Sequence, residues 1–111
     1  MRFTLVKTNR FEKDIKSIIK RGYDISLIEK VIDDYLIIGK PLPAIYKDHK
    51  LYGDYEGNRE CHITPDWLLV YRIYEDSLFL QLTRTGSHSD LFRWYEKIIF
   101  MWYWWNHYWW F

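Results

Sequence analysis

The side chains best suited to acid–base chemistry lie in the second half of the chain. Imidazole titrates at about pH 6.5, so a histidine can accept or donate a proton near neutrality. Cleavage of an RNA phosphodiester needs both transfers, because the 2′-hydroxyl loses a proton and the leaving 5′-oxygen gains one. An arginine fork stabilises the negative charge that develops between these steps. The candidates are His49, His62, Asp66 and His88, with the cations Lys47, Lys50, Arg59 and Arg84 nearby.

Each of these residues also has an ordinary structural interpretation. A histidine on a strand is often a surface residue, Asp66 after Pro65 suits a turn or cap, and Arg84 suits a surface cation. Cys61 is expected to be a small buried hydrophobic residue. The composition permits a zinc site of histidine and aspartate, but the chain has no compact H-x-x-x-H spacing. We therefore expect neither a metal nor a cofactor.

Length and composition narrow the class of protein. A chain of 111 residues with 28% charged residues is one folded domain rather than a disordered segment. The net charge of +1 excludes a polycation, and a single cysteine excludes an internal disulfide and fits a reducing compartment. The N-terminus has no signal-peptide pattern, and the apolar stretch 98–111 is too short for a membrane-spanning helix. We expect a cytoplasmic protein with no membrane association.

Aromatic residues make up 21% of the chain, and they concentrate at its end. Residues 93–111 hold 11 aromatic side chains, including six of the seven tryptophans, with no period that would form a clean face. The first 92 residues carry 14 basic and 14 acidic side chains and are formally neutral. We expect residues 1–92 to form the functional domain and the extension 93–111 to lie outside it.

The first half of the chain predicts one strand and two helices. Residues 2–7 alternate as a strand, with Phe3 and Leu5 on one face. Asn9 with Glu12, and Ser26 with Glu29, form capping-box patterns that predict where the helices begin. Gly22 is expected to end the first helix, and the second should end near Gly39, because Pro41 and Pro43 follow. The two helices should pack as a hairpin. Their apolar stripes are Phe11, Ile15, Ile18 and Ile19, and then Leu27, Ile28, Val31, Ile32 and Tyr35.

The second half changes to the period of strands. Residues 58–63, 67–74 and 78–83 predict three strands, with a tight connection at 75–77 that favours an antiparallel hairpin. In the first of them Cys61 and Ile63 should face the core, so Glu60 and His62 share the other face and His62 should point off the sheet. Arg84 should sit just past the last strand, before a polar loop at 85–89. The order β-α-α-β-β-β predicts an α+β fold, a small antiparallel sheet packed on a helical hairpin.

Three sequence blocks add a resemblance to a known family. They are D-H-x-L at 48–51, R-E-C-H-I-x-P-D-W-L-L at 59–69 and R-T-G-S-H-S-x-L-F at 84–92. Each block is weak alone, but together they resemble the YafQ-type toxins of the RelE/ParE superfamily. The resemblance covers residues 1–92 and includes the order of the elements, so it implies a RelE-like fold.

The resemblance implies a toxin of a type II toxin–antitoxin pair, a ribosome-dependent mRNA endonuclease that cuts codons in the A site of the 70S ribosome. It implies a cognate antitoxin that blocks the site and operator DNA bound only through the complex. Its active-site motif falls on His49, His62, Asp66, Arg84, His88 and Phe92. His88 is then the candidate general acid, Asp66, His62 and His49 share base and orienting roles, and Arg84 steadies the phosphate. Phe92 would hold a nucleotide by stacking, with Lys50 and Arg59 as further substrate contacts, whereas Trp67 is expected in the core.

Two other functions stay open from the sequence. The fold could be a non-catalytic binding module, or a ParE-like toxin that acts on DNA gyrase, although ParE-like chains lack this histidine set. A ribonuclease that works without the ribosome is disfavoured by the neutral body, because unassisted RNA binding relies on many phosphate contacts from lysine and arginine. Chains of the family normally end near the position of Phe92, so the extension 93–111 departs from the pattern and could obstruct the site.

Overall fold

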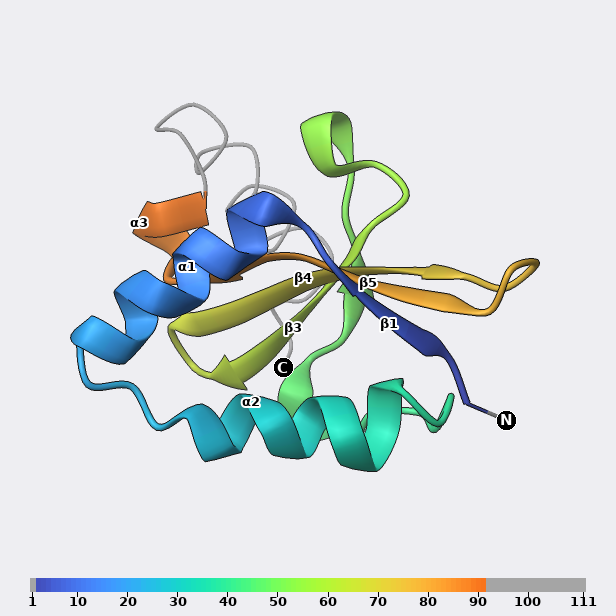
Figure 1. Ribbon diagram of the computed structural model, residues 1–111, viewed down its shortest axis with the longest axis horizontal. Helices are drawn as coiled ribbons and strands as arrows, with labels where there is room; N and C mark the ends of the chain where they lie inside the picture. Colours follow the sequence, from blue (N-terminus) through green and yellow to red (C-terminus); the bar gives the residue numbers. More distant parts are fainter. Residues whose placement is uncertain (1, 92–111) are drawn as a thin grey trace.

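The computed structural model describes residues 2–91, so Phe92 and the extension 93–111 lie outside the described residues. The expected order of elements is confirmed, with additions (Figure 1). No helix among the described residues is long and apolar enough to cross a bilayer. The elements are β1 (Thr4–Lys7), α1 (Asn9–Lys20), α2 (Ile25–Val31), a π-helical turn (Ile32–Leu36), two 3₁₀ turns (Ala44–Tyr46 and Gly53–Tyr55), β2 (His49–Lys50), β3 (Arg59–Thr64), β4 (Trp67–Tyr74), β5 (Phe79–Gly86) and α3 (His88–Leu91).

The five strands form one sheet in the order β1-β5-β4-β3-β2. The pairs β2–β3, β3–β4 and β4–β5 are antiparallel, but β1 runs parallel to β5, with Leu5 opposite Leu80. The sheet is therefore mixed rather than wholly antiparallel. The two-residue strand β2 was not expected from the sequence. It matters for function because it pairs His49 with Glu60.

Both helices begin earlier than the capping boxes predict. Thr8 is the N-cap of α1, and its Oγ1 accepts a hydrogen bond from the Phe11 amide at 3.0 Å, so Asn9 is already helical. Asp24 caps α2 and accepts from the Ser26 amide at 3.0 Å. Thr8 and Asp24 lie one and two positions before the predicted caps, Asn9 and Ser26. Both have the extended backbone and the side-chain oxygen that an N-cap requires. Gly22, with φ of +82°, follows the end of α1 as expected.

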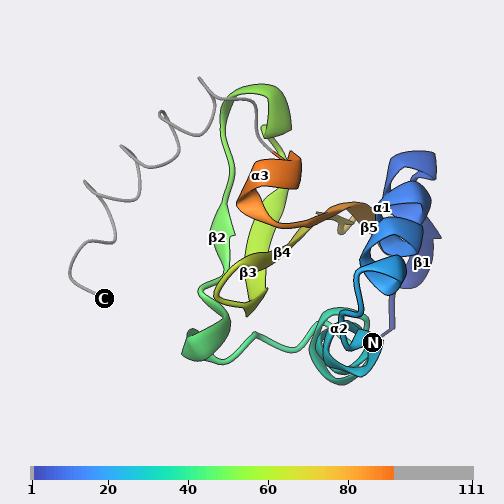
Figure 2. The same ribbon diagram turned by 90° about the vertical axis from the view of Figure 1, so that its left-hand side faces the viewer.

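The main core lies between the helices and one face of the sheet. α1 packs mainly on β5 and α2 lies near β3, so the pair is more open than a close-packed helical hairpin (Figures 1 and 2). Trp67 and Cys61 are buried in this core, as expected. Ile19 and Leu27, which were predicted in the apolar stripes of the helices, are exposed. Each lies at the edge of the face that its helix buries. The core cluster comprises Phe3, Phe11, Ile18, Ile28, Val31, Ile32, Leu36, Ile37, Cys61, Ile63, Trp67, Leu69, Tyr71, Leu80 and Leu82.

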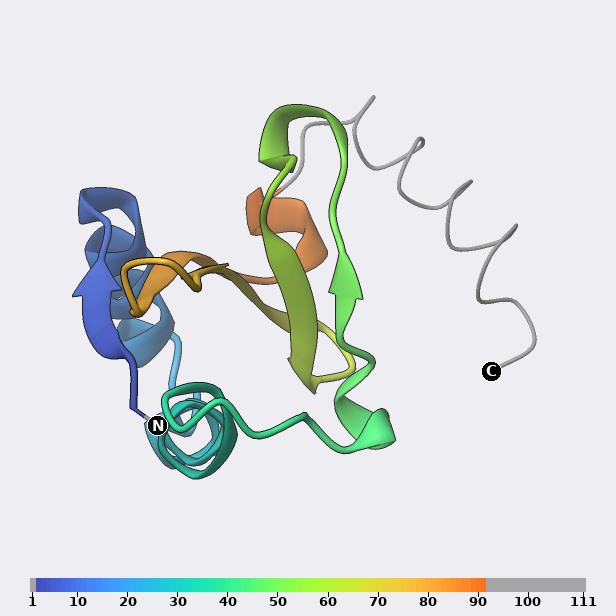
Figure 3. The ribbon, with the colours of Figure 1, turned by 90° about the vertical axis from the view of Figure 1, so that its right-hand side faces the viewer.

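The opposite face of the sheet carries a smaller apolar cluster, formed by Leu51, Leu68, Val70 and Leu91. The short helix α3 and the β2 segment lie on this side, away from α2 (Figure 3). Strand β5 continues to Gly86, so Arg84 lies inside the strand and the expected polar loop is mostly strand and helix. Leu78 precedes β5 with a φ of +55° and is exposed, so it does not share the buried face of Leu80 and Leu82.

Candidate functional site

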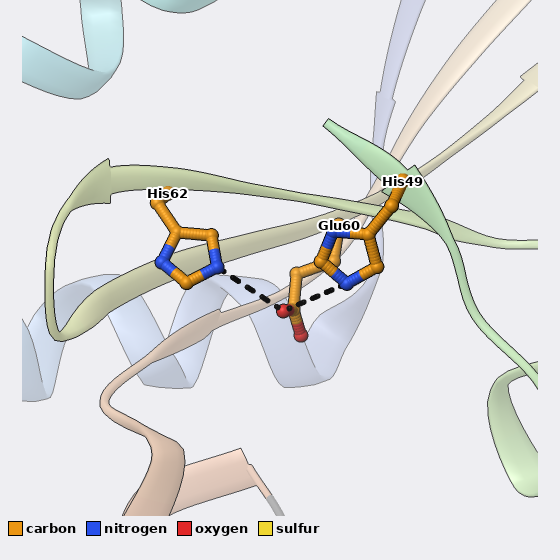
Figure 4. A group of neighbouring side chains, drawn as sticks. All are labelled: His49, Glu60 and His62. Carbon is orange, nitrogen blue, oxygen red and sulfur yellow. Dashed lines mark ion pairs between the residues drawn. The ribbon is translucent and has the colours of Figure 1, made fainter. Parts of the chain in front are cut away.

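Three buried polar side chains converge on the second face of the sheet. The carboxylate of Glu60 lies between two imidazoles, with its Oε1 3.4 Å from His49 Nε2 and 3.8 Å from His62 Nε2 (Figure 4). Glu60 has no exposed surface, and His49 and His62 are 5% and 8% exposed. We call these three residues the His–Glu–His cluster.

Strand pairing explains how the cluster forms. β2 pairs with β3 so that His49 stands opposite Glu60, and the pleat places Glu60 and His62 on one face of β3. His62 is therefore on the face that the sequence predicts. It points off the sheet on the side opposite Cys61 and Ile63, but this face is covered, so His62 is buried.

Backbone carbonyls fix both imidazoles of the cluster. His49 Nδ1 lies 2.7 Å from the carbonyl oxygen of Lys47, and His62 Nδ1 lies 3.4 Å from that of Pro65. A carbonyl oxygen only accepts hydrogen bonds, so each Nδ1 carries the proton and donates it. The lone pair of each neutral ring is then on Nε2, and both Nε2 atoms face Glu60.

Burial shifts the pKa values of all three groups. Loss of hydration lowers the pKa of His49 and lowers that of His62 to about 4. The same effect raises the pKa of Glu60 to about 8. The two imidazoles are therefore neutral near pH 7, whereas the Glu60 carboxyl is mostly protonated at that pH.

Asp66 and His88 form a second pair beside the cluster. Asp66 lies in the turn between β3 and β4, and His88 begins α3. Asp66 Oδ1 is 3.0 Å from His88 Nδ1 and 3.4 Å from the His88 amide nitrogen. The hydrogen bond from His88 lowers the pKa of Asp66, so its carboxylate is charged. Asp66 therefore orients the His88 ring through Nδ1.

The histidines are close enough to act on one reacting group. The ring centroids of His62 and His88 are 5.9 Å apart, and those of His49 and His62 are 6.2 Å apart. The structure thus brings together four of the predicted residues, His49, His62, Asp66 and His88. The site has the neutral imidazoles of His49 and His62 on one side and the His88 imidazole, oriented by Asp66, on the other. This arrangement suits a reaction with two proton transfers.

Arg84 reaches a different set of partners. Its Nε and Nη2 bind the two carboxylate oxygens of Asp14 in α1 at 3.0 and 3.1 Å, and its Nη1 lies 3.5 Å from the Tyr55 hydroxyl. Asp14 also accepts from the Thr85 amide at 3.2 Å. The two-point pair with Asp14 fixes the guanidinium, so a phosphate would have to reach the face that Asp14 leaves open.

Lys50 and Arg59 lie apart from the histidines. They are paired across β2 and β3, and the pleat turns them to the face opposite His49 and Glu60. Arg59 Nη2 lies 2.8 Å from Asp48 Oδ2 and forms an ion pair with it. Asp48 also accepts a short hydrogen bond from the Tyr71 hydroxyl. Lys50 and Arg59 line a surface pocket with Asn58, Ile73 and Glu75. The third expected substrate contact, Phe92, lies outside the described residues.

Sequence reasoning missed two members of the site, Glu60 and Asp14. Strand alternation already placed Glu60 beside His62, so that signal was present in the sequence. The partner of Arg84 had no such signal, because Asp14 is 70 positions away in the chain and meets it only through the packing of α1 on β5.

Comparison with known proteins identifies the family that this chain matches. Residues 3–93 match the model of the family described as bacterial toxin of type II toxin-antitoxin system, YafQ. The mRNA interferase toxin YafQ of Escherichia coli strain K12 is 36% identical over 85 residues, which cover 77% of this chain and 90% of that protein.

Two solved structures have the same fold. The Escherichia coli DinJ–YafQ complex matches with a TM-score of 0.74 at 34% identity, covering 83% of this chain and 100% of that one. A metal-bound toxin from Helicobacter pylori matches with a TM-score of 0.75 at 43% identity and the same coverage. The chain therefore belongs to the YafQ family of bacterial toxins of type II toxin–antitoxin systems.

Proposed function

We propose that this chain is the toxin of a type II toxin–antitoxin pair and that it cleaves mRNA on the ribosome by metal-independent acid–base catalysis. The proposal is supported by family membership and by relatives named mRNA interferases. The observation that carries it is the Asp66–His88 pair beside the two neutral imidazoles of His49 and His62.

The geometry suggests a division of roles. His88 is the general acid that protonates the leaving 5′-oxygen, because Asp66 orients its ring through Nδ1. The proton of the 2′-hydroxyl passes to His62 or His49, on the other side of the site. Both rings carry the lone pair on Nε2. Arg84, held by Asp14, supplies a fixed guanidinium for the phosphate.

The ribosome supplies the positioning that the domain lacks. Residues 1–92 are formally neutral, so they provide little of the phosphate attraction that free RNA binding requires. We infer a cytoplasmic toxin that is held inactive by a cognate antitoxin, as the Escherichia coli relative is bound by DinJ. Operator DNA would be bound only through that complex. Residues 1–92 would be the toxin domain, and the extension 93–111 would stand outside it.

A cleavage assay on translating ribosomes tests the proposal. The wild type should cut mRNA within the A-site codon, and His88→Ala and Asp66→Ala should each lower the rate by about 10²-fold or more, because each removes part of the acid. Lys30→Ala, an exposed change on α2, is the control and should keep the rate. Full cleavage by a double variant at positions 66 and 88 would contradict the site assignment.

The alternative functions give different results in the same experiment. Cleavage of naked RNA at the ribosomal rate would contradict the need for the ribosome. Intact mRNA together with inhibited DNA supercoiling would favour a gyrase-directed toxin. Neither result would change the family assignment.

A further inference from the structure

The guanidinium of Arg84 lies where three parts of the chain meet. Strand β5, which carries Arg84, contacts both α1 and α3 (Figures 1 and 2). The segment after β2 also reaches the guanidinium, through the hydroxyl of Tyr55. Because the Arg84 side chain is only 14% exposed, these neighbours decide which of its N–H groups can meet a substrate.

Asp14 occupies one edge of this guanidinium. Its Oδ2 accepts from Arg84 Nε at 3.0 Å, and its Oδ1 accepts from Nη2 at 3.1 Å. Two parallel, charge-assisted bonds of this kind are among the strongest that arginine forms. The carboxylate is itself held in place, because its Oδ2 also accepts from the Thr85 amide at 3.2 Å. The Nε–Nη2 edge is therefore closed to a phosphate.

The Nη1–Nη2 edge of Arg84 makes only long contacts with residues 2–91. Nη1 lies 3.5 Å from the Tyr55 hydroxyl, and Nη2 lies 3.5 Å from the carbonyl oxygen of Asp90 in α3. Both distances exceed the usual range of about 2.7–3.2 Å for N–H···O bonds, and both acceptors are neutral. A charged phosphate oxygen binds a guanidinium more strongly and would replace them. A phosphate bound at this edge lies next to the helix that carries His88.

The Tyr55 hydroxyl connects this edge to the end of α3. It donates to the Leu91 carbonyl oxygen at 3.2 Å while it faces Arg84 Nη1. The Tyr55 side chain also packs against the smaller apolar cluster, which includes Leu91. Leu91 directly precedes Phe92, the residue expected to stack on a nucleotide. The hydroxyl thus links the guanidinium to the backbone immediately before that residue.

We propose that Asp14 and Tyr55 are positioning residues for the cleavage reaction. Asp14 directs the Nη1–Nη2 edge of Arg84 to the scissile phosphate, and Tyr55 holds that edge beside the end of α3. This inference rests on the proposed function and deepens it. Neither residue touches the reacting atoms, and loss of Asp14 leaves the charge of Arg84 in place but lets its guanidinium turn. Both residues should therefore affect turnover more than binding, because a small displacement of a catalytic group reduces the rate strongly.

Single-turnover cleavage, measured over a range of ribosome concentrations, separates the maximal rate from the half-saturating concentration. Asp14→Asn should lower the maximal rate by about tenfold and leave the half-saturating concentration within about twofold. Tyr55→Phe, which keeps the ring, should lower the maximal rate by about threefold.

Two matched changes are the controls. Glu12→Gln makes the same carboxylate-to-amide change at an exposed position of α1, and Tyr74→Phe removes a hydroxyl from an exposed tyrosine of β4. Both should keep the wild-type rate. Circular dichroism and urea unfolding confirm that every variant is folded at the assay temperature.

A double-mutant cycle distinguishes positioning from structural support. Arg84→Gln should lower the maximal rate by at least about 10²-fold, because it removes a group that stabilises charge in the transition state. In that background Asp14→Asn should have almost no further effect, since no guanidinium is left to direct. If Asp14→Asn instead lowers the rate by the same factor in both backgrounds, the proposal is overturned. Wild-type maximal rates in Asp14→Asn and Tyr55→Phe would also overturn it.

The orientation of Arg84 is tested separately, without reference to cleavage. In NMR spectra of the isotopically labelled full chain, the Arg84 Nε proton should exchange slowly with water in the wild type and in Glu12→Gln, and rapidly in Asp14→Asn. Equal exchange in the wild type and Asp14→Asn would contradict the pairing with Asp14. A wild type that never cuts ribosome-bound mRNA would contradict the proposed function and the catalytic role of both residues. Slow exchange in the same sample would still support the fixed orientation of Arg84.

Discussion

Arg21 and Asp90 form a two-point ion pair that joins the end of α1 to the short helix carrying His88. Arg21 Nη2 lies 2.6 Å from Asp90 Oδ2, and Nη1 lies 3.3 Å from Oδ1. Asp90 Oδ2 also accepts from the Ser87 amide at 2.8 Å. The backbone on both sides of His88 is therefore tied to α1, which indicates that Arg21 positions the candidate general acid without touching a substrate.

Arg21→Gln should lower the cleavage rate by about tenfold while changing the free energy of unfolding by no more than about 1 kcal/mol. The pair is partly exposed, so it contributes little to stability, but a small displacement of a catalytic group reduces the rate strongly. Arg21→Lys should recover only part of the rate, because an ammonium lacks the two-point geometry. The rate on ribosomes and urea unfolding measure the two effects.

Lys20→Gln is the control for that change, since Lys20 is an exposed cation of the same helix end. Lys20→Gln should leave both the cleavage rate and the free energy of unfolding unchanged. Equal losses of rate in Arg21→Gln and Lys20→Gln would mean that general charge, rather than the pair with Asp90, is responsible.

At acidic pH the free energy of unfolding should depend on the charge of the Asp90 carboxylate. Burial raises the pKa of Asp90, but hydrogen bonds from Arg21 and Ser87 outweigh it, so the pKa is below its usual 3.8. A lowered pKa adds stability that is present above the unfolded value and is lost as pH falls through the folded value. The wild type should therefore exceed Asp90→Asn in free energy of unfolding at neutral pH, and the difference should shrink below about pH 4.

Urea unfolding at a series of pH values measures that difference. Arg21→Gln provides a second comparison, because it removes one of the groups that lower the Asp90 pKa and should weaken the acid dependence without abolishing it. A gap between wild type and Asp90→Asn that stays constant down to the acid limit would show that the carboxylate charge is not the stabilising feature.

Local patterns in the sequence predicted most of the fold and part of the site. Alternation placed β3 and β4 correctly, and it put Glu60 beside His62, because the period of a strand is a local property. The N-cap of α1 was one residue off, since Thr8 and Asn9 are both good caps and only the backbone conformation distinguishes them. The parallel pairing of β1 with β5 had no local signal.

The geometry of the site depends on contacts between distant segments. His49 meets Glu60 through a strand of only two residues, which no pattern in the sequence marks. Burial of the His–Glu–His cluster, and the pKa shifts that follow, result from packing over the second face of the sheet. Residue types therefore predicted the chemistry, whereas the protonation states required the structure.

Gly86 should tolerate substitution less well than Gly22, although both have positive φ. A Cβ on Gly86 would lie 2.8 Å from Asp90 Cβ and 2.9 Å from its Oδ2, whereas a Cβ on Gly22 meets nothing within 4 Å. Gly22→Ala should cost about 1 kcal/mol from backbone strain alone. Gly86→Ala should cost about 2 kcal/mol or more, because the strained backbone and the clash add.

The same pair of variants separates strain from positioning in the cleavage assay. Gly86→Ala displaces Asp90 and with it α3, so its rate should fall, while Gly22→Ala should keep the wild-type rate at a temperature where both are folded. Identical free energies of unfolding for the two variants would contradict the contact between Gly86 and Asp90.

Thr85→Val should destabilise the domain by about 2–3 kcal/mol, although threonine and valine side chains have the same shape. The cost arises because two hydrogen bonds are lost. Trp67 Nε1 donates to Thr85 Oγ1 at 2.9 Å, and Thr85 Oγ1 donates to the Leu68 carbonyl at 2.6 Å, with Thr85 only 1% exposed. Valine leaves the buried indole N–H and the carbonyl without their partner. Urea unfolding of the purified domain measures the loss.

Thr83→Val is the matched control on the same strand. Thr83 Oγ1 donates to Asn58 Oδ1 at 2.7 Å, but Thr83 is only half-buried, so water can replace the bond and the cost should stay near 1 kcal/mol. In a double-mutant cycle, Trp67→Phe removes the donor, so Thr85→Val should cost less in that background. Additive costs would show that the indole does not depend on Thr85, and the hydrogen bond would then contribute nothing to stability.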